Sequence, residues 1–324
     1  MDLPTYEDVA AAHARIALHI VRTPMLRSPA LDALTGGTIL LKPEPLQRTG
    51  SFKLRGATNA LRQLGPAARR AGVVTHSSGN HGQAVACAAA ALEVAATVFM
   101  PADAPAIKRD STARWGATIR AYDRLRDSRE ALSAGFAAET GATLIPPYDH
   151  PHVMAGQGTA ALELAQDAAA AGLTLDALLV CTGGGGLVAG SALAMEGAAP
   201  ATRVFCVEPE GWDDTTRSLA AGERVANAPG GPMLCDALLA PIPGELTFAV
   251  NRRRLAGGVV VQEGDVLAAM RFAFAQLKLV VEPGGVVALA ALLAGRFDAR
   301  GKVVGAVISG GNVDPALFAR VLAA

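Results

Sequence analysis

The stretch LLVCTGGGGL, residues 178–187, decides the fold class that we expect for this chain. Its first four residues form a short apolar run of the kind that is buried on both faces of a parallel sheet. Four consecutive glycines follow, and a helical pattern begins at Leu187. Because glycine loses more conformational freedom on folding than any other residue, four in a row are costly as a simple turn. Backbone amides at the start of a helix suit a phosphate group, so we expect a phosphate site there.

The same alternation of strand and helix extends outward from this stretch in both directions. Short apolar runs predict strands at residues 38–42, 73–75, 94–100, 117–122, 178–181, 204–208 and 303–308. Alanine-rich stretches predict helices at residues 54–64, 81–92, 106–115, 128–140, 155–171 and 187–195. Repeated βα units indicate a doubly wound α/β architecture with open sheets. The segment 221–243 is rich in Gly and Pro and predicts a long irregular excursion.

The composition is that of a globular protein with a large core, since 51% of the residues are hydrophobic and 18% are charged. At 324 residues the chain exceeds the usual size of one domain, so we expect two compact units. Lys plus Arg equal Asp plus Glu at 29 each, which gives no reason to expect nucleic acid or an anionic membrane surface as a partner. No run reaches the roughly 18 apolar residues of a membrane span.

The N-terminus and the cysteines predict the compartment. Residues 1–5, MDLPT, lack the basic region and apolar run of a secretory signal. The 4 cysteines lie far apart without CxxC spacing, and three of them have apolar surroundings. We expect buried, reduced thiols and therefore a cytoplasmic protein.

Three further clusters follow predicted strands, at the edge where open α/β sheets bind ligands. TGSFKLRG, residues 49–56, places Lys53 at the start of a helix between Phe52 and Leu54. Apolar neighbours disfavour the ammonium form and lower the pKa of a lysine, which makes its amine a nucleophile suited to Schiff-base formation. Taken alone, a lysine at a helix start is far more often a solvated surface charge, so the other clusters decide.

The other two clusters are also polar turns. HSSGNHGQA, residues 76–84, is dense in hydrogen-bond donors that could bind a carboxylate or a cofactor oxygen, or could simply cap a helix. SGGNVD, residues 309–314, directly follows an apolar strand.

The glycine stretch allows a second interpretation. Gly184, Gly186 and Ala189 fit the dinucleotide pattern G-x-G-x-x-A, and Glu208 lies near the expected distance downstream. A nicotinamide- or flavin-dependent oxidoreductase is therefore an alternative at this point. The chain has neither the G-x-x-x-x-G-K-[ST] segment of nucleotide-binding loops nor the G-x-S-x-G nucleophile elbow.

Taken together, SFKLRGA, SSGNHGQA, GGGGL and SGGNVD resemble, in order and spacing, the fold-type II enzymes that use pyridoxal phosphate (PLP), the fold of the tryptophan synthase β subunit. The likeness is greatest to the serine racemase and serine/threonine dehydratase group, which includes 3-hydroxyaspartate dehydratases. It runs from about residue 22 to residue 314. A dinucleotide site would explain neither Lys53 nor the turn at 77–81, so the resemblance favours PLP.

The resemblance implies which residues bind the cofactor. Lys53 would bind PLP covalently, and Phe52 would pack against its ring. Asn80 would hydrogen-bond the phenolic oxygen, and Ser309 would face the pyridine nitrogen. A serine there cannot enforce protonation of the nitrogen as a carboxylate does, which suits elimination of a β-leaving group. The phosphate would be held by Gly183, Gly184, Gly185, Gly186 and Leu187.

The activity implied is that of an ammonia-lyase. The β-hydroxyl of serine, threonine or 3-hydroxyaspartate would be lost to give a 2-oxo acid and ammonia, with Lys53 as general base at Cα. Ser78 resembles the serine that racemases place on the opposite face of the cofactor, so racemisation of serine or aspartate is the alternative on the same scaffold. A catalytically silent PLP-binding or amino-acid-sensing protein is a further alternative.

The resemblance also implies the substrate contacts. Ser77, Ser78, Asn80 and the amide of His81 would hold the substrate carboxylate. Arg129 would lie near the distal end of a dicarboxylate, which makes 3-hydroxyaspartate an attractive substrate because guanidinium suits a second carboxylate. The alternative is an exposed arginine in the first turn of a helix.

A divalent-cation site, a domain division and a dimer complete the expectations from the resemblance. The carboxylates of Glu208 and Asp214 and the carbonyl of Trp212 would bind Mg²⁺, Ca²⁺ or Mn²⁺, which prefer oxygen ligands. Residues 72–149 would form a small, mobile domain that closes over the substrate. Residues 1–71 and 150–324 would form the large PLP-binding domain, and two chains would form a homodimer.

Overall fold

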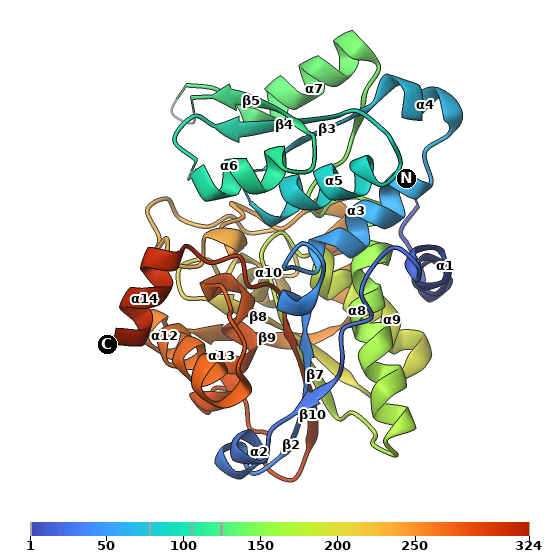
Figure 1. The fold of residues 1–324 in the computed structure, drawn as a ribbon. Coiled ribbons are helices and arrows are strands. Elements are labelled where there is room, and N and C mark those ends of the chain that lie inside the picture. The colour runs from blue at the N-terminus through green and yellow to red at the C-terminus, as the bar shows by residue number, and fades with distance from the viewer. Residues whose placement is uncertain (1, 78, 105, 124–125, 324) are drawn as a thin grey trace.

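The chain folds into two α/β units, each built on its own sheet (Figure 1). The computed structural model describes residues 2–77, 79–104, 106–123 and 126–323, and the side chains of 106–108 are outside that description. Ser78 therefore lies outside the described residues. The larger unit fills the lower part of Figure 1 and contains both termini. The smaller unit lies above it.

The larger sheet has six strands in the order β1-β2-β10-β7-β8-β9. The strands are β1 (Leu26–Arg27), β2 (Thr38–Pro43), β7 (Ala177–Cys181), β8 (Arg203–Pro209), β9 (Leu255–Val261) and β10 (Val303–Ile308). All neighbours are parallel except β1 and β2. The ends of β10 and β7 that carry the conspicuous polar turns therefore lie at one edge of the sheet.

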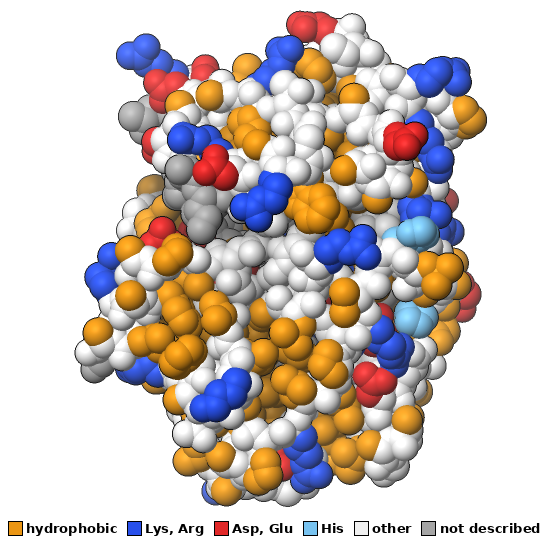
Figure 2. All heavy atoms as spheres, in the orientation of Figure 1, with side chains coloured by type: hydrophobic (Ala, Val, Ile, Leu, Met, Phe, Trp, Pro, Cys, Tyr) orange, Lys and Arg blue, Asp and Glu red, His pale blue; other side chains and the backbone are white. Residues whose placement is uncertain are grey.

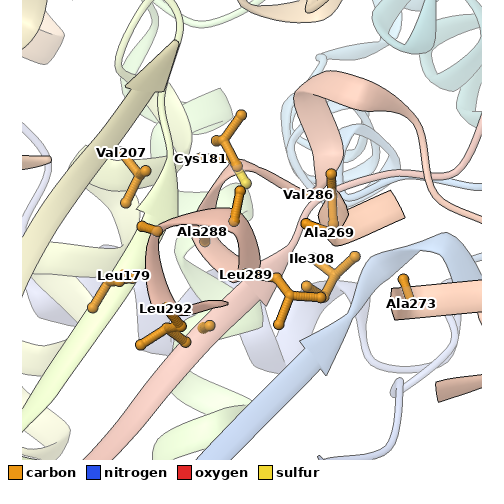
Figure 3. Close-up of a cluster of buried hydrophobic side chains, with 14 of the residues drawn as sticks. Leu179, Cys181, Val207, Ala269, Ala273, Val286, Ala288, Leu289, Leu292 and Ile308 are labelled. Atoms are coloured by element: carbon orange, nitrogen blue, oxygen red, sulfur yellow. The ribbon is translucent and has the colours of Figure 1, made fainter. Parts of the chain in front are cut away.

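Both faces of this sheet are buried, as the continuous apolar runs predict. Leu178 and Val180 of β7 belong to the core with α1 (Tyr6–Ile16), α8 (Pro151–Ala170) and α9 (Gly186–Ala198). Leu179 and Cys181 alternate to the other face, where Figure 3 shows them beside residues of α13 (Val287–Leu293). The same face is covered by α2 (Pro29–Thr35), α12 (Glu263–Phe272) and α14 (Pro315–Ala323).

The smaller sheet has four parallel strands in the order β5-β4-β3-β6. They are β3 (Val73–His76), β4 (Ala96–Pro101), β5 (Thr118–Tyr122) and β6 (Thr143–Leu144). In Figure 1, α5 (Asn80–Ala90) and α6 (Ala106–Ala113) lie below the sheet and α7 (Arg129–Thr140) lies above it. This sheet comes from within the segment 72–149 that we expect to form the small domain. The domain limits and the mobility of this unit stay predictions.

Two helices connect the units, α3 (Lys53–Arg62) and α4 (Pro66–Ala71), while α10 (Asp214–Ala221) and α11 (Glu245–Arg254) belong to the larger unit. The predicted excursion at 221–243 is irregular except for the end of α10 and a short turn at Asp236–Leu238. All four cysteines are free and buried, including the three for which apolar surroundings predict burial. Within the described residues, no helix is both long enough and apolar enough to cross a membrane.

Candidate active site

The four sequence clusters converge on one cavity of about 320 Å³ between the two units. The expected cofactor and substrate residues that line it are Phe52, Lys53, Ser77, Asn80, His81, Arg129, Gly183, Gly184, Gly185, Gly186, Leu187 and Ser309. Every predicted PLP and substrate residue in the described chain is thus brought together. The larger unit contributes the glycine loop and Ser309, and the smaller unit contributes the turn after β3 and the start of α7.

Lys53 is the first residue of α3, and its amine lies inside the cavity wall. Its Nζ donates a hydrogen bond to the carbonyl of Pro147 at 2.7 Å and lies 5.1 Å from the centroid of the Phe52 ring. Burial lowers the pKa of Lys53 to about 8, and the negative charge of Glu282 opposes part of that shift. This direction agrees with the one that its apolar neighbours predict, and a substantial fraction of the amine is neutral near pH 8.

The glycine loop joins β7 to α9, and Gly185 at its N-cap has a φ of +90°. A side chain at Gly183 would place its Cβ 3.0 Å from Cα of Leu238, and one at Gly184 would fall on the ring of Tyr148. Only glycine fits this approach of loop to neighbouring backbone and ring. The backbone amides at the start of α9 lie at the cavity wall and suit an anion such as phosphate.

The turn after β3 places Asn80 at the start of α5, in the middle of a side-chain network. Nδ2 of Asn80 donates to Oε1 of Glu282 at 2.5 Å, and Nδ2 of Asn312 donates to Oδ1 of Asn80 at 2.7 Å. Two sequence clusters, 76–84 and 309–314, are therefore joined by a direct hydrogen bond. Oγ of Ser77 accepts a hydrogen bond from the amide of Gly79 at 3.2 Å.

The imidazole of His81 has a structural place in the site. Its Nε2 lies 2.9 Å from the carbonyl of Ile145, and the side chain is buried. Burial, together with the nearby charge of Lys53, lowers the pKa of His81 to about 3, so the ring is neutral. We expect His81 to contact the substrate through its backbone amide. The position of the ring is compatible with that contact.

Glu282 and His76 are two of the cavity residues to which the sequence analysis assigned no role. Glu282 is buried in the cavity wall beside Asn80, and it stands in the sequence EPGG that none of the four clusters contains. His76 lies inside the cluster at 76–84, and its Nδ1 is 2.8 Å from Oγ of Ser133 on α7. The histidine could have been singled out from its motif, whereas no local pattern marked the glutamate.

Arg129 opens α7 at the cavity wall and is half-exposed. Its Nε bonds to Oε1 of Glu130 at 2.7 Å. This bond uses one edge of the guanidinium, and the terminal NH₂ groups keep the geometry for paired hydrogen bonds with a carboxylate. Both expectations for this arginine hold in part, because it reaches the cavity and also contacts solvent.

The expected cation ligands lie away from the cavity, at the end of β8 and the start of α10. The carboxylate of Glu208 accepts hydrogen bonds from the amides of Thr215 at 2.9 Å and Thr216 at 2.8 Å. Oδ1 of Asp214 accepts one from Asn227 at 2.7 Å, while its buried Oδ2 has no partner among the described residues. Burial raises the pKa of Glu208 to about 8 and that of Asp214 to about 6.

This pair fits a cation chemically but is not a dense ligand cluster. In the described part of the chain, no three His, Cys, Asp or Glu side chains are grouped as metal ligands. The expected set has two carboxylates and one carbonyl, so water would have to complete the coordination of a hard cation.

Comparison with known proteins identifies the family. The sequence profile of the family described as "Pyridoxal-phosphate dependent enzyme" matches residues 16–310. The chain belongs to this family of PLP-dependent enzymes.

Related PLP enzymes match over the whole chain. An L-threo-3-hydroxyaspartate ammonia-lyase from Pseudomonas sp is 43% identical over 99% of this chain and 99% of its own length. A serine racemase from Schizosaccharomyces pombe is 41% identical over 99% and 98%. The structure of maize serine racemase superposes with a TM-score of 0.93 at 36% identity, covering 99% of this chain and 98% of that one. The expected fold-type II PLP fold is confirmed, and the dinucleotide interpretation of Gly184 to Ala189 loses its support.

Proposed function

We propose that this PLP enzyme is an ammonia-lyase that removes the β-hydroxyl from 3-hydroxyaspartate. One molecule of water is lost in the elimination and one is consumed in hydrolysis, so a 2-oxo acid and ammonia are the products. The observation that carries the proposal is that Lys53 and Arg129 line the same cavity. A relative named as an L-threo-3-hydroxyaspartate ammonia-lyase is 43% identical over the full length, which supports it.

PLP, when bound, supplies an electron sink for the electron pair left at Cα of the amino acid. The glycine loop would hold its phosphate, and Asn80 and Ser309 would lie against its ring. These residues fit the group, because the glycine loop, Asn80 and Ser309 line one cavity and the loop leads into the amides at the start of α9.

Lys53 would move the proton at Cα. A lysine with a pKa of about 8 has a neutral amine available near physiological pH, which an ordinary lysine does not. The site next to the amine is shielded by Phe52 and by the segment of Pro147. A hydroxyl such as that of Ser309 is a weak partner for the pyridine nitrogen, and this favours departure of a β-leaving group over a long-lived carbanion.

Arg129 would select the substrate. Ser77, Asn80 and the amide of His81 would hold the α-carboxylate, and the guanidinium would bind the β-carboxylate in a paired arrangement. Serine and threonine lack the second carboxylate and would leave the arginine paired with Glu130. Ser78 lies outside the described residues, and a role for it as a second base would make racemisation a side activity.

The test is product analysis with matched variants. Ammonia and 2-oxo acid release would be measured from the 3-hydroxyaspartate isomers, serine and threonine, and the chirality of recovered serine and aspartate would report racemisation. Lys53→Ala should lose all turnover. Arg129→Met should lower kcat/KM for 3-hydroxyaspartate about 10- to 100-fold, the size expected for lost charge-assisted hydrogen bonds, and change that for serine far less.

The control for Arg129 is Arg126→Met, which removes an exposed guanidinium that pairs with Asp123 from the preceding loop. It should leave the preference for 3-hydroxyaspartate unchanged. An equal loss of kcat/KM for serine and for 3-hydroxyaspartate in Arg129→Met would contradict the proposed substrate. Racemisation without release of ammonia would show that the enzyme is a racemase and not a lyase.

Three further properties belong to the same proposal. Glu208, Asp214 and the carbonyl of Trp212 would bind a divalent cation with a structural role. The unit at 72–149 would move as a lid that excludes water.

The chain would form a homodimer, for which the exposed Phe274 and Val280 offer an apolar surface. Figure 2 shows hydrophobic side chains gathered on the lower half of the molecule, over α12, α13 and α14. The mass in solution, measured by light scattering, would test the dimer.

A further inference from the structure

The outer side of the glycine loop is attached to α11, a helix that does not line the cavity. The hydroxyl of Thr247 donates to the carbonyl of Gly184 at 2.8 Å, and the amide of Gly244 donates to the same carbonyl at 3.4 Å. Nδ2 of Asn251 makes a longer contact of 3.5 Å with the carbonyl of Gly185. The side chains of Thr247 and Asn251 are both fully buried.

The start of α11 is itself held by a carboxylate from another part of the chain. Oδ2 of Asp149 accepts from the amide of Glu245 at 3.0 Å, and its Oδ1 accepts from the amides of Leu246 at 2.9 Å and Thr247 at 3.0 Å. Three amides at a helix N-terminus have no partner inside the helix, so one carboxylate satisfies them and opposes the helix dipole. A side chain at Gly244 would fall on Oδ1 of Asp149, so this approach requires glycine.

These contacts determine which way the loop amides point. The carbonyl and the N–H of a trans peptide lie on opposite sides, and the described chain contains no cis peptide bond. Since the carbonyl of Gly184 points to Thr247, the N–H of Gly185 points away from α11. The glycine loop lines the cavity and Thr247 does not, so this N–H points to the cavity side.

We propose that Asp149 and Thr247 are positioning residues for the cofactor phosphate. We call Asp149, Thr247 and the amide of Gly244 the glycine-loop clamp. The clamp holds the peptide between Gly184 and Gly185 with its carbonyl outward and its amide toward the phosphate. A four-glycine loop left to itself would sample many conformations, so fixing one of them favours phosphate binding. The inference rests on the proposed function, since it takes the phosphate of PLP as the ligand of the loop.

The segment that carries Asp149 also contacts the reactive lysine. Pro147 accepts the hydrogen bond from Lys53, and the ring of Tyr148 lies against Gly184. Three consecutive residues, 147–149, therefore contact the lysine, the glycine loop and the start of α11. The clamp makes this segment a common support for both ends of the cofactor site.

The experiment compares two ligands that differ only by the phosphate. Apoenzyme would be titrated with PLP and with pyridoxal, and the ratio of the two Kd values would be taken as the contribution of the phosphate. Thr247→Val keeps the shape but removes the donor, and it should raise the Kd for PLP about five- to tenfold while that for pyridoxal stays unchanged. Thr247→Ser should restore the ratio, and Asp149→Ala should lower PLP affinity in the same selective way.

The matched controls remove the same kinds of bond elsewhere. The hydroxyl of Thr202, also buried, donates to the carbonyl of Leu175 at 2.9 Å, so Thr202→Val is the partner of Thr247→Val. Asp8 accepts from the amide of Thr5 at the start of α1, so Asp8→Ala is the partner of Asp149→Ala. Both controls should leave the Kd ratio unchanged. The ³¹P resonance of bound PLP should shift in the Thr247→Val enzyme and not in Thr202→Val.

An unchanged ratio in both Thr247→Val and Asp149→Ala would overturn the clamp, as would equal losses for PLP and pyridoxal. Neither result bears on the substrate. Conversely, an enzyme that releases no ammonia from any amino acid would overturn the proposed function, while the Kd ratio would still test the clamp.

Discussion

At the scale of single residues, the reactivity of Lys53 comes from its surroundings. The amine lies in a partly closed cavity beside Phe52, where burial disfavours the charged form more than Glu282 favours it. An amine with a pKa of about 8 is more often neutral at pH 7 to 8 than a solvated lysine, and the neutral form is the nucleophile and the base.

The rate at which the apoenzyme captures PLP should therefore follow the neutral fraction of Lys53. The rate should rise with pH up to about 8 and then level off, because above its pKa the amine is already deprotonated. Stopped-flow absorbance of PLP mixed with apoenzyme between pH 6 and 10 would measure it. Glu282→Gln removes the charge that favours the ammonium, so it should move the profile to lower pH. A rate that keeps rising toward pH 10, as for an exposed lysine, would contradict the assignment.

The sequence predicted those site residues that stand in local motifs. Lys53, Asn80 and the glycines of the loop at 183–186 belong to short sequence patterns, and these patterns predict their chemistry without a structure. Glu282 was missed because it enters the site only when the turn after β10 packs against the preceding segment, where the amide of Glu282 bonds to the carbonyl of Gly310. Contacts between segments far apart in sequence leave no local signal.

At the scale of elements, α3 is held in place by buried charges just behind Lys53. Arg55 makes paired hydrogen bonds with Glu44, at 2.8 Å each, and with Glu163, at 2.8 and 2.9 Å. Nζ of Lys42 bonds to Glu163 at 2.7 Å. These two acids and two bases are all fully or almost fully buried and compensate each other's charge. Such a group does not have to add net stability, but removing one member leaves a charge buried without its partner.

Glu163→Gln should therefore lower the free energy of unfolding by about 3–5 kcal/mol, the size expected when a buried ion pair loses one partner. Denaturant unfolding would measure it. Glu196→Gln breaks the exposed pair with Arg254, 2.7 Å apart, and as the control it should cost less than about 1 kcal/mol. The double variant Lys42→Met with Glu163→Gln removes one charge of each sign and should recover part of the loss. Equal effects of the two single variants would show that the buried group is no more important than a surface pair.

Several of the elements that the sequence predicted carry apolar residues of the core, as in β7, β10 and α9. All seven predicted strands are present, whereas β1, β6 and β9 were not predicted. β1 and β6 have two residues each, and in β9 Gly257 and Gly258 interrupt the apolar run. Helix α11 was missed for a different reason. Two of its four buried residues are the polar Thr247 and Asn251, so it lacks an apolar stripe. The side chains that hide this helix from a periodicity argument are the ones that contact the glycine loop.

At the scale of the whole molecule, the site exists only where the two units meet. The chain leaves the larger unit after α3, builds the smaller sheet and returns through residues 147–149. The length of the chain predicted two units, and the alternation of strands and helices predicted their class. The way the units face each other comes from long-range packing, which composition and periodicity do not encode.

The stability of the whole molecule should depend on a divalent cation bound at β8 and α10. Glu208 and Asp214 are fully buried. Burial raises the pKa of both carboxyls, and the charge of Asp214 raises the pKa of Glu208 further, so a cation between them would favour their ionised forms. A cation that binds only the folded chain stabilises it by mass action, by about 2.7 kcal/mol at a hundredfold excess over Kd. We expect Mg²⁺ or Mn²⁺ to raise the Tm at pH 8 by about 5 °C, and EDTA to reverse the shift. Asp214→Asn should abolish the response, while Asp213→Asn, which removes the neighbouring carboxylate paired with Arg217, should keep it. The same Tm shift in both variants would show that the cation binds elsewhere. If the unmodified enzyme shows no shift, these two carboxylates do not bind a cation and only support the start of α10.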